Sequence, residues 1–213
     1  AYCDDMLEIS NDDAEKAKYK GLIDILIPIA KGYVSDHAYD VCNIGMQVYG
    51  GYGYIKEYPQ EQFVRDCRIT MIYEGTNGIQ AMDLLGRKLG MNEGKSVMDL
   101  LGEIQSVIAR AKAIPVLTDL ADRLTEALNK LGEVAMHMGK TAMSAKALDA
   151  FAFAYPFMDV MGDVVMAWML LWRASIAAKR LEEGAKKKDQ AFYEGQTRRS
   201  EERRVGKECR SRW

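Results

Sequence analysis

The sequence predicts an all-α protein, and three observations predict it. Apolar residues recur every three or four positions along most of the 213 residues, which is the period of a helix buried on one side. Capping residues precede these patterns, and glycine or proline interrupts them. No segment alternates apolar and polar side chains as a half-buried strand does. The composition, 48% hydrophobic and 28% charged, is that of an ordinary soluble globular protein.

The first long helical pattern follows the Ser-Asn-Asp-Asp run at 10–13, where several side chains can cap a helix. Pro28 interrupts this pattern, either as a kink or as the first turn of the next helix. The pattern resumes through Tyr49 and ends at 50–53, where three of four residues are glycine. We therefore expect a long helical segment that stops at this glycine-rich stretch.

Two shorter patterns follow Pro59. The first places Phe63, Cys67 and Met71 on one face of a helix. The second begins near Thr76, and its apolar stripe consists of Ile79, Met82, Leu85, Gly86 and Leu89. Gly90 is expected to end this helix in a left-handed conformation.

Residues 90–94 are typical of a connection between two domains, since they hold two glycines and an asparagine. Beyond them, amphipathic patterns at 97–111, at 117–131 and at about 144–181 predict three further helices, with Pro156 as a candidate break in the last. We expect a first helical domain at 1–90 and a second, small antiparallel helical bundle at 91–196. The apolar run at 164–172 has nine residues, whereas a membrane span needs about twenty. It predicts a buried helix and no membrane span.

Residues 197–213 differ in character from the rest of the chain. They carry six Arg and one Lys against three Glu, a net charge of +4, which leaves −6 on the other 196 residues. We expect a basic tail that is foreign or disordered, because it resembles read-through sequence. Binding of nucleic acid by the arginines is the weaker alternative. The overall net charge of −2 gives no general attraction to nucleic acid or anionic membranes.

The four cysteines and two histidines show no metal-ligand spacing, so no metal site is predicted. Cysteines without close spacing are typical of a reduced, intracellular protein. The chain opens with Ala1 and shows no targeting signal in its first residues.

Two segments carry candidate chemistry: QVYGGYGY at 47–54 and IYEGTNG at 72–78. Alone, each is a weak signal, because a glycine-rich loop is usually a turn and a glutamate near a helix start is usually an exposed residue. Joined without a gap by EYPQEQFVRDCRI at 57–69, they resemble the C-terminal helical domain of the acyl-CoA dehydrogenases over residues 11 to 90. YEGTNGIQAMDLLGRKL, followed by a further helical domain, resembles the branch that includes the 3-methylmercaptopropionyl-CoA dehydrogenases.

The resemblance implies an FAD-dependent oxidoreductase. In this family a base removes the proton α to a thioester, the β carbon gives hydride to flavin N5, and the product is a trans-2-enoyl-CoA. By this resemblance Glu74 is the catalytic base, and the Gly75 backbone lies beside the substrate thioester. A carboxylate suits the role, because partial burial raises its pKa toward that of a useful proton acceptor. A helix start also supplies backbone N–H groups that can polarise the thioester oxygen.

The resemblance also assigns contacts with FAD to two segments. The segment that reaches the FAD of a neighbouring subunit comprises Gln47, Val48, Tyr49, Gly50 and Gly51. The positions at or near the FAD of the same subunit are Thr76, Asn77 and Gly78. Glycine lets the backbone approach a cofactor closely, although Gly78 replaces an acidic residue that many relatives carry. Arg65 and Asp66 are interpreted as an ordinary solvated helix face.

Further expectations follow from the resemblance: an acyl-CoA substrate, an electron-transfer flavoprotein as electron acceptor, a homodimer or homotetramer, and a bacterial cytoplasmic location. Whether the substrate is 3-methylmercaptopropionyl-CoA stays open. The family's N-terminal helical domain and middle β-domain have no counterpart in this sequence, so we expect the isolated chain to be inactive. The alternative is a non-catalytic helical module for oligomerisation or partner binding.

Overall fold

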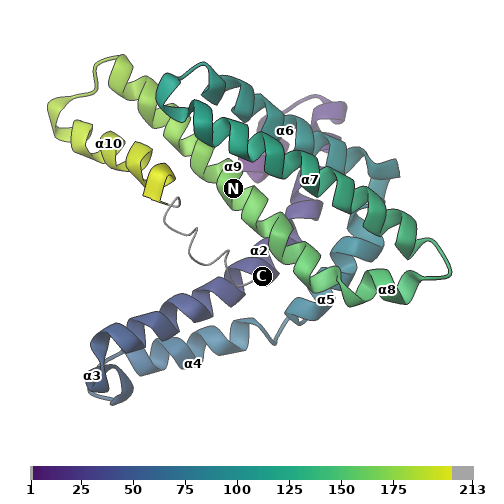
Figure 1. The fold of residues 1–213 in the computed structure, drawn as a ribbon, viewed down its shortest axis with the longest axis horizontal. Coiled ribbons are helices and arrows are strands. Elements are labelled where there is room, and N and C mark those ends of the chain that lie inside the picture. Colours follow the sequence, from purple (N-terminus) through teal and green to yellow (C-terminus); the bar gives the residue numbers. More distant parts are fainter. Residues whose placement is uncertain (1, 203–213) are drawn as a thin grey trace. The chain divides into compact units, whose positions relative to one another are not determined.

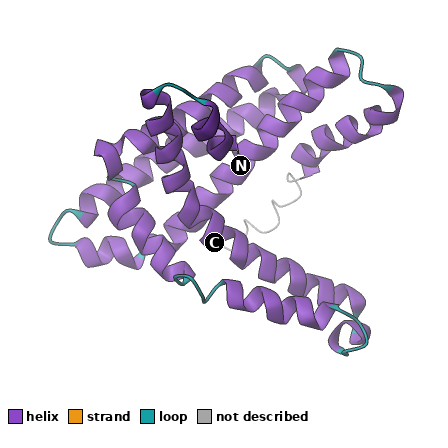
Figure 2. Ribbon diagram, turned by 180° about the vertical axis from the view of Figure 1, so that it is seen from behind, coloured by secondary structure: helices purple, strands orange, loops and turns teal. Residues whose placement is uncertain are grey.

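The computed structural model describes residues 2–202, with the side chains of residues 2–197, and all regular secondary structure in this range is helical (Figure 2). The prediction of an all-α chain is therefore confirmed. The chain forms two compact units. One holds the residues up to Asp99 together with Val134–Gly162, and the other holds Leu100–Glu133 together with the residues from Asp163 onward.

The helices follow one another in the order of Figure 1. They are α1 (Tyr2–Ile9), α2 (Asp13–Tyr49), α3 (Gly51–Tyr54), α4 (Gln60–Thr70), α5 (Asn77–Asp83), α6 (Lys95–Lys112), α7 (Thr118–Ala142), α8 (Ala147–Ala152), α9 (Ala154–Glu182) and α10 (Lys187–Glu202). A π-helical turn at Leu84–Lys88 continues α5, and short 3-10 turns lie at Met91–Gly94 and Pro115–Leu117.

Helix α2 is the longest element, and its start is capped as expected. The Asp12 carboxylate accepts a hydrogen bond from the backbone N–H of Ala14 at 2.9 Å. The helix runs without a break through Pro28, so the alternative in which Pro28 opens a new helix is wrong. It ends at Tyr49, where Gly50 has a positive φ of 60°.

Helix α4 returns along the last third of α2, and α3 lies at their far end (Figure 1). The Sγ atoms of Cys42 on α2 and Cys67 on α4 lie 3.2 Å apart, and this hydrogen bond raises the pKa of the Cys42 thiol. No residue of α4 is fully buried in this structure. The predicted apolar face of α4 is therefore an exposed or half-buried one, with Phe63 exposed.

A π-helical turn continues α5 as far as Lys88. The backbone N–H of Leu89 donates to the carbonyl of Leu84 at 3.0 Å, an i to i+5 bond that inserts an extra residue into the turn. The stripe predicted for this helix is only partly correct, since Ile79 and Met82, which precede the π-helical turn, are exposed. The residues that are buried are Ala81, Leu84, Leu85 and Lys88.

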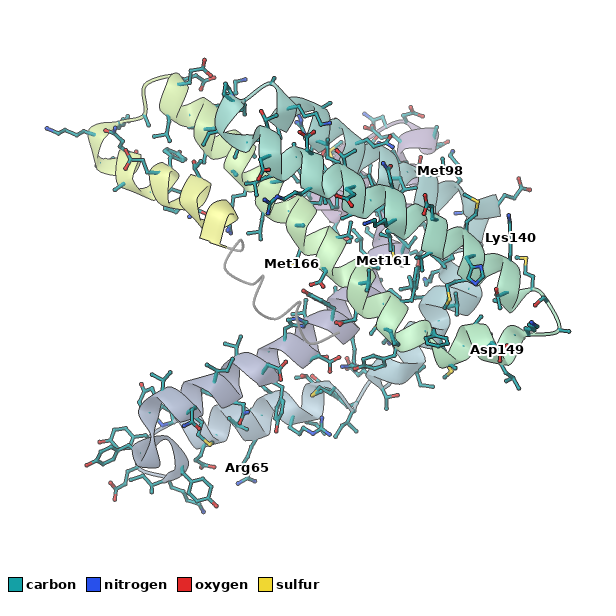
Figure 3. The ribbon with its side chains drawn as sticks, in the orientation of Figure 1. Arg65, Met98, Lys140, Asp149, Met161 and Met166 are labelled. Carbon is teal, nitrogen blue, oxygen red and sulfur yellow. The ribbon has the colours of Figure 1, made fainter. Side chains whose placement is uncertain are left out.

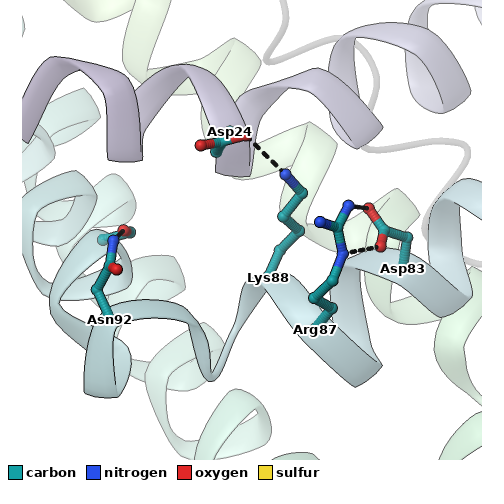
Figure 4. A network of polar contacts seen from close by, with 6 residues as sticks. Asp24, Asp83, Arg87, Lys88 and Asn92 are labelled. Carbon is teal, nitrogen blue, oxygen red and sulfur yellow. Dashed lines mark hydrogen bonds and ion pairs between the residues drawn. The ribbon is translucent and has the colours of Figure 1, made fainter. Parts of the chain in front are cut away.

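The buried face of this segment includes a lysine. Lys88 is only 5% exposed, and its Nζ lies 2.8 Å from Oδ1 of Asp24 on α2 (Figure 4). Its neighbour Arg87 forms an exposed pair with Asp83 one turn earlier, and this pair lowers the pKa of the Asp83 carboxyl. The buried pair thus ties the end of the α5 segment to the middle of α2.

The predicted left-handed stop at Gly90 is wrong, because Gly90 has φ −88° and ψ −6°. The reversal occurs two residues later. Asn92, Glu93 and Gly94 all have positive φ and turn the chain into α6.

The three helices predicted after residue 94 are present as α6, α7 and the α8–α9 pair. The break in the last pattern lies at Phe153, so Pro156 falls in the first turn of α9, where its missing N–H removes no helical bond. Helices α6, α7 and α9 each contribute residues to both compact units. The predicted division into 1–90 and 91–196 stays a prediction.

Among the described helices, α9 is long and apolar enough to cross a membrane by length and composition alone. Core helices of soluble proteins meet the same criterion, and 44% of the most apolar window of α9 is buried within the fold. Its buried side chains recur every three or four residues, as on a packed core helix. They include Phe157, Met161, Val164, Trp168 and Leu171.

Helix α10 includes the first six residues of the predicted tail, 197–202. The expectation that the tail is foreign or disordered stays a prediction. Residues 203–213 lie outside the described part of the chain.

Candidate active site

The turn between α4 and α5 has an unusual backbone. After α4, the backbone N–H groups of Ile72 and Tyr73 both donate to the carbonyl of Ile69, at 2.9 and 3.1 Å. The next two residues, Glu74 and Gly75, are both left-handed, with φ of 54° and 82°. The turn therefore reverses the chain within the IYEGTNG motif.

A left-handed conformation is ordinary for Gly75 but costly for Glu74, by about 1–2 kcal/mol, because its Cβ approaches the following carbonyl. Such costs persist where the surrounding structure holds the residue in place, and they cluster at functional sites. The Glu74 side chain is exposed. The partial burial predicted for this carboxylate is therefore not provided by the residues that the structure describes.

The same turn presents unused backbone donors. The N–H groups of Glu74, Gly75 and Thr76 donate to no acceptor among the described residues. The Thr76 hydroxyl instead caps α5, where its Oγ1 accepts from the backbone N–H of Ile79 at 3.4 Å. A carboxylate and several backbone donors thus lie within three consecutive residues, which is an arrangement that can receive a polar ligand group.

Asn77 holds this turn on α2. Its side chain is 4% exposed, and its Oδ1 accepts from Lys31 Nζ at 2.9 Å. Its Nδ2 donates to Asp36 Oδ1 at 2.8 Å and to Ser35 Oγ at 2.9 Å. The side chain is therefore directed at α2, and the predicted contact of Asn77 with FAD stays a prediction. Gly78, also predicted to lie near FAD, sits in the first turn of α5.

The second predicted segment lies at the end of α2 and the start of α3. All five of its residues, Gln47 to Gly51, are exposed. A Cβ built on Gly50 or Gly51 would meet nothing within 4 Å, so the backbone here is open to a ligand. Their contact with a neighbouring subunit's FAD stays a prediction.

The structure does not bring the two predicted segments together. Asn77 bonds Asp36, and the axis of α2 rises roughly 21 Å between Asp36 and Gly50 at 1.5 Å per residue. The glycine-rich segment and the Glu74 turn are therefore separate surfaces of this chain.

Sequence reasoning missed the residues that anchor the turn. Lys31, Ser35 and Asp36 are neighbouring polar residues on an otherwise apolar stretch of α2, which was an available signal. Tyr155, whose hydroxyl donates to Asp36 Oδ2, lies 119 residues away along the chain and gave no such signal. Arg65 is exposed on α4 (Figure 3), and so is Asp66, as the interpretation of a solvated helix face expects. In the described residues, no cluster of three or more His, Cys, Asp or Glu side chains is arranged to hold a metal ion.

Comparison with protein families identifies two matches that together cover most of the chain. Residues 6–89 match the model described as acyl-CoA dehydrogenase, C-terminal domain. Residues 100–199 match the model described as acetyl-CoA dehydrogenase C-terminal like. The first match includes the Glu74 turn and the glycine-rich segment.

Individual relatives agree with these matches. The broad-specificity linear acyl-CoA dehydrogenase FadE5 of Mycobacterium tuberculosis is 30% identical over 177 residues, which are 81% of this chain and 29% of that protein. The 3-methylmercaptopropionyl-CoA dehydrogenase of Ruegeria pomeroyi is 32% identical over 183 residues, 84% of this chain and 30% of that protein. Subunit CarC of the caffeyl-CoA reductase-Etf complex of Acetobacterium woodii is 48% identical over 61 residues, 29% of this chain and 16% of that protein. The chain thus spans less than a third of the length of the relatives it matches.

Proposed function

This chain belongs to the acyl-CoA dehydrogenase family, and from that premise we propose that it is the C-terminal part of an FAD-dependent enzyme that oxidises acyl-CoA thioesters to trans-2-enoyl-CoA. Glu74 is the base that removes the α proton. The observation that carries the proposal is the strained left-handed turn of Glu74 and Gly75, whose backbone N–H groups have no acceptor among the described residues.

The carboxylate of Glu74 suits proton removal because it is compact and already exposed at the tip of a turn. A carboxylate in water is a weak base toward a C–H bond, and exclusion of water raises its pKa. In the complete enzyme, the bound acyl chain and the further length of the protein exclude that water. Exclusion of water from Glu74 therefore makes its carboxylate a more effective acceptor of the α proton.

Removal of the α proton also requires that negative charge on the thioester oxygen be stabilised. The backbone N–H of Glu74 has no acceptor among the described residues and lies on the same turn as the carboxylate. A fixed donor that costs no reorganisation is the type of group that stabilises a developing enolate. We assign this role to the Glu74 backbone, with Gly75 as the neighbour of the thioester.

The residues present fit FAD at the glycine-rich segment. Gly50 and Gly51 leave open space where a side chain would stand, so the backbone can approach a flat or phosphorylated ligand. Gln47, Val48 and Tyr49 would line this approach, and Thr76 would lie near a second flavin beside the Glu74 turn. When bound, FAD accepts the hydride that leaves the β carbon.

The substrate and the electron acceptor are proposed from the names of the relatives. One relative is named for broad-specificity linear acyl-CoA and another for 3-methylmercaptopropionyl-CoA, so we propose a linear acyl-CoA, with the methylthio compound as one candidate. The CarC subunit belongs to a complex named for Etf, which supports an electron-transfer flavoprotein as acceptor.

Anaerobic flavin reduction tests this function. A series of saturated acyl-CoA thioesters is added to the complete FAD-loaded protein, and the oxidised flavin absorbance is followed. We expect bleaching by at least one thioester and none by the matching free carboxylic acids. An FAD-loaded protein that no thioester reduces contradicts the proposal.

A second candidate function rests on an exposed apolar stripe of α2. Ile27, Val34, Val41 and Val48 repeat every seven residues, and Ile44 lies three residues beyond Val41, all of them exposed. This a/d spacing is the pattern of a helix that packs against another helix. We propose that other copies of the chain cover the stripe in a homodimer or homotetramer. In a protein that has no flavin chemistry, forming this oligomer would be the only function of the chain.

Sedimentation velocity, combined with the FAD content and flavin reduction of the same protein, separates the enzyme from the non-catalytic module. The variant Val41→Lys should dissociate the oligomer, whereas Asn43→Lys, which adds the same charge on another side of the exposed helix, should not. Stable oligomers of a protein that neither retains FAD nor reduces it favour the non-catalytic module. Identical oligomers of both variants exclude the stripe as the interface.

A further inference from the structure

The buried carboxamide of Asn77 is the hub of a polar network that runs from α2 to α9. It contacts Lys31, Ser35 and Asp36, all on α2. Since Asn77 is 4% exposed and its oxygen and nitrogen both have partners on α2, the orientation of the side chain is fixed.

Asp36 extends the network, because each of its carboxylate oxygens has a different partner. Oδ1 accepts from Asn77 Nδ2 at 2.8 Å, and Oδ2 accepts from the hydroxyl of Tyr155 at the start of α9. A carboxylate held at both oxygens cannot rotate freely. It therefore keeps Oδ1 aimed at Asn77.

The network connects the two segments that matched different family models. Asn77 and Asp36 lie within residues 6–89, and Tyr155 lies within residues 100–199. All three belong to the same compact unit. The second matched segment thus contributes one hydroxyl directly to the support of the turn.

Asn77 is also the point at which the turn closes. Its backbone N–H donates to the carbonyl of Met71 at 3.3 Å, so residues 72–76 form a loop between these two positions. The loop includes the left-handed pair of Glu74 and Gly75. A shift of Asn77 would change the direction of the Glu74 carboxylate and of the N–H groups beside it.

We propose that Tyr155 and Asp36 are positioning residues for the Glu74 turn: the hydroxyl of Tyr155 orients the Asp36 carboxylate, which holds Asn77 and so fixes the turn. Their role in catalysis rests on the function proposed above, in which Glu74 is the base. The second matched segment then serves the reaction through a side chain that touches neither substrate nor cofactor.

Amide hydrogen exchange of this chain, followed by NMR, tests the positioning without any need for catalysis. Tyr155→Phe keeps the ring and removes only the hydroxyl, and Tyr193→Phe on α10 makes the same change far along the chain as a control. We expect about tenfold faster exchange at the amides of Asn77 and Ile79 in Tyr155→Phe, with the α4 amide of Phe63 unchanged. Equal rates in the two variants, or equal acceleration at all three amides, overturn the proposal.

Kinetics of the complete FAD-loaded enzyme give the second readout. Tyr155→Phe should lower kcat about tenfold with KM for acyl-CoA and FAD content unchanged, because the base is misdirected and the binding surface is intact. Asp36→Asn should have a similar effect, and the double variant should be no worse than Asp36→Asn alone. A change in KM with unchanged kcat overturns the positioning role. If the wild-type enzyme oxidises no thioester, the function fails, and the hydrogen exchange result alone decides whether Tyr155 holds the turn.

Discussion

Asn77 Nδ2 donates a hydrogen bond of 2.8 Å to Oδ1 of Asp36, which joins the first residue of α5 to the middle of α2. The two residues are 41 positions apart in the chain. The bond places the strained Glu74 turn against the longest helix of its unit. A rigid helix thus supports a short, exposed loop that carries the candidate chemistry.

Replacement of Glu74 should raise the free energy of unfolding and abolish acyl-CoA oxidation. Glu74→Asn keeps a polar side chain but tolerates the left-handed conformation better, so it should stabilise the chain by about 0.5–1 kcal/mol. Urea unfolding of the chain gives this value. Glu93, also left-handed with φ 57°, provides the control. Glu93→Asn should stabilise equally but leave acyl-CoA oxidation by the complete enzyme unchanged, and a loss of stability in Glu74→Asn would show that the turn is not strained.

Gly162 should be intolerant of any side chain. A Cβ at this position of α9 would lie 2.2 Å from Cδ2 of the Tyr33 ring on α2. Gly162→Ala should therefore destabilise the chain by about 1–3 kcal/mol through overpacking. Gly139→Ala on α7, where a Cβ meets nothing within 4 Å, should instead stabilise by up to about 1 kcal/mol. Thermal unfolding of both variants checks this difference, and equal shifts would refute the close approach of α9 to Tyr33.

Replacing Asp24 should destabilise the chain more than replacing its partner Lys88. Asp24→Ala leaves a buried ammonium without a partner and should cost about 3 kcal/mol. Lys88→Met leaves Asp24, which is partly exposed to water, and should cost less than about 1 kcal/mol. Denaturant unfolding should show that the double variant regains most of the stability lost in Asp24→Ala. Equal losses in the two single variants would contradict the account of Lys88 as the buried partner.

Tyr155 should make stability depend on pH in the alkaline range. Burial, and then the hydrogen bond to Asp36, raise its pKa from 10.0 to about 12. The unfolded chain loses this proton at lower pH than the folded chain, so the contribution is complete below pH 10 and is lost as pH rises toward 12. Because Tyr155 is 39% exposed, solvent screening limits the effect to about 1 kcal/mol. Unfolding of Tyr155→Phe beside wild type across this range should show the difference narrowing with pH, and a constant difference would argue against the Asp36 contact.

Local patterns were sufficient to predict most helices and the residues of the turn. The capping Asp12, the stop at Gly50 and the helix starts near Pro59 and Thr76 all lie close to their predicted places. These features depend on neighbouring residues along the chain, where capping and backbone preferences act.

The predictions that failed concern contacts between residues that are distant in the sequence. The buried face of the α5 segment includes Lys88, which pairs with Asp24 on α2, and leaves Met82 exposed, and a pattern of apolar residues cannot anticipate a buried lysine. The partners of Asn77 come from α2, and Tyr155 reaches Asp36 from α9. Spacing along the sequence reports none of these tertiary contacts.

The central claim, that Glu74 is the catalytic base, is tested most directly by proton exchange. The complete FAD-loaded protein and its Glu74→Gln variant are incubated in deuterium oxide with an acyl-CoA, and deuterium at the α carbon is measured by NMR. Glutamine keeps the size of the side chain and the backbone donors of the turn but cannot accept the proton at neutral pH. The account predicts rapid exchange in the wild type and its loss in the variant, with FAD still bound. Exchange at the wild-type rate by FAD-loaded Glu74→Gln would contradict it.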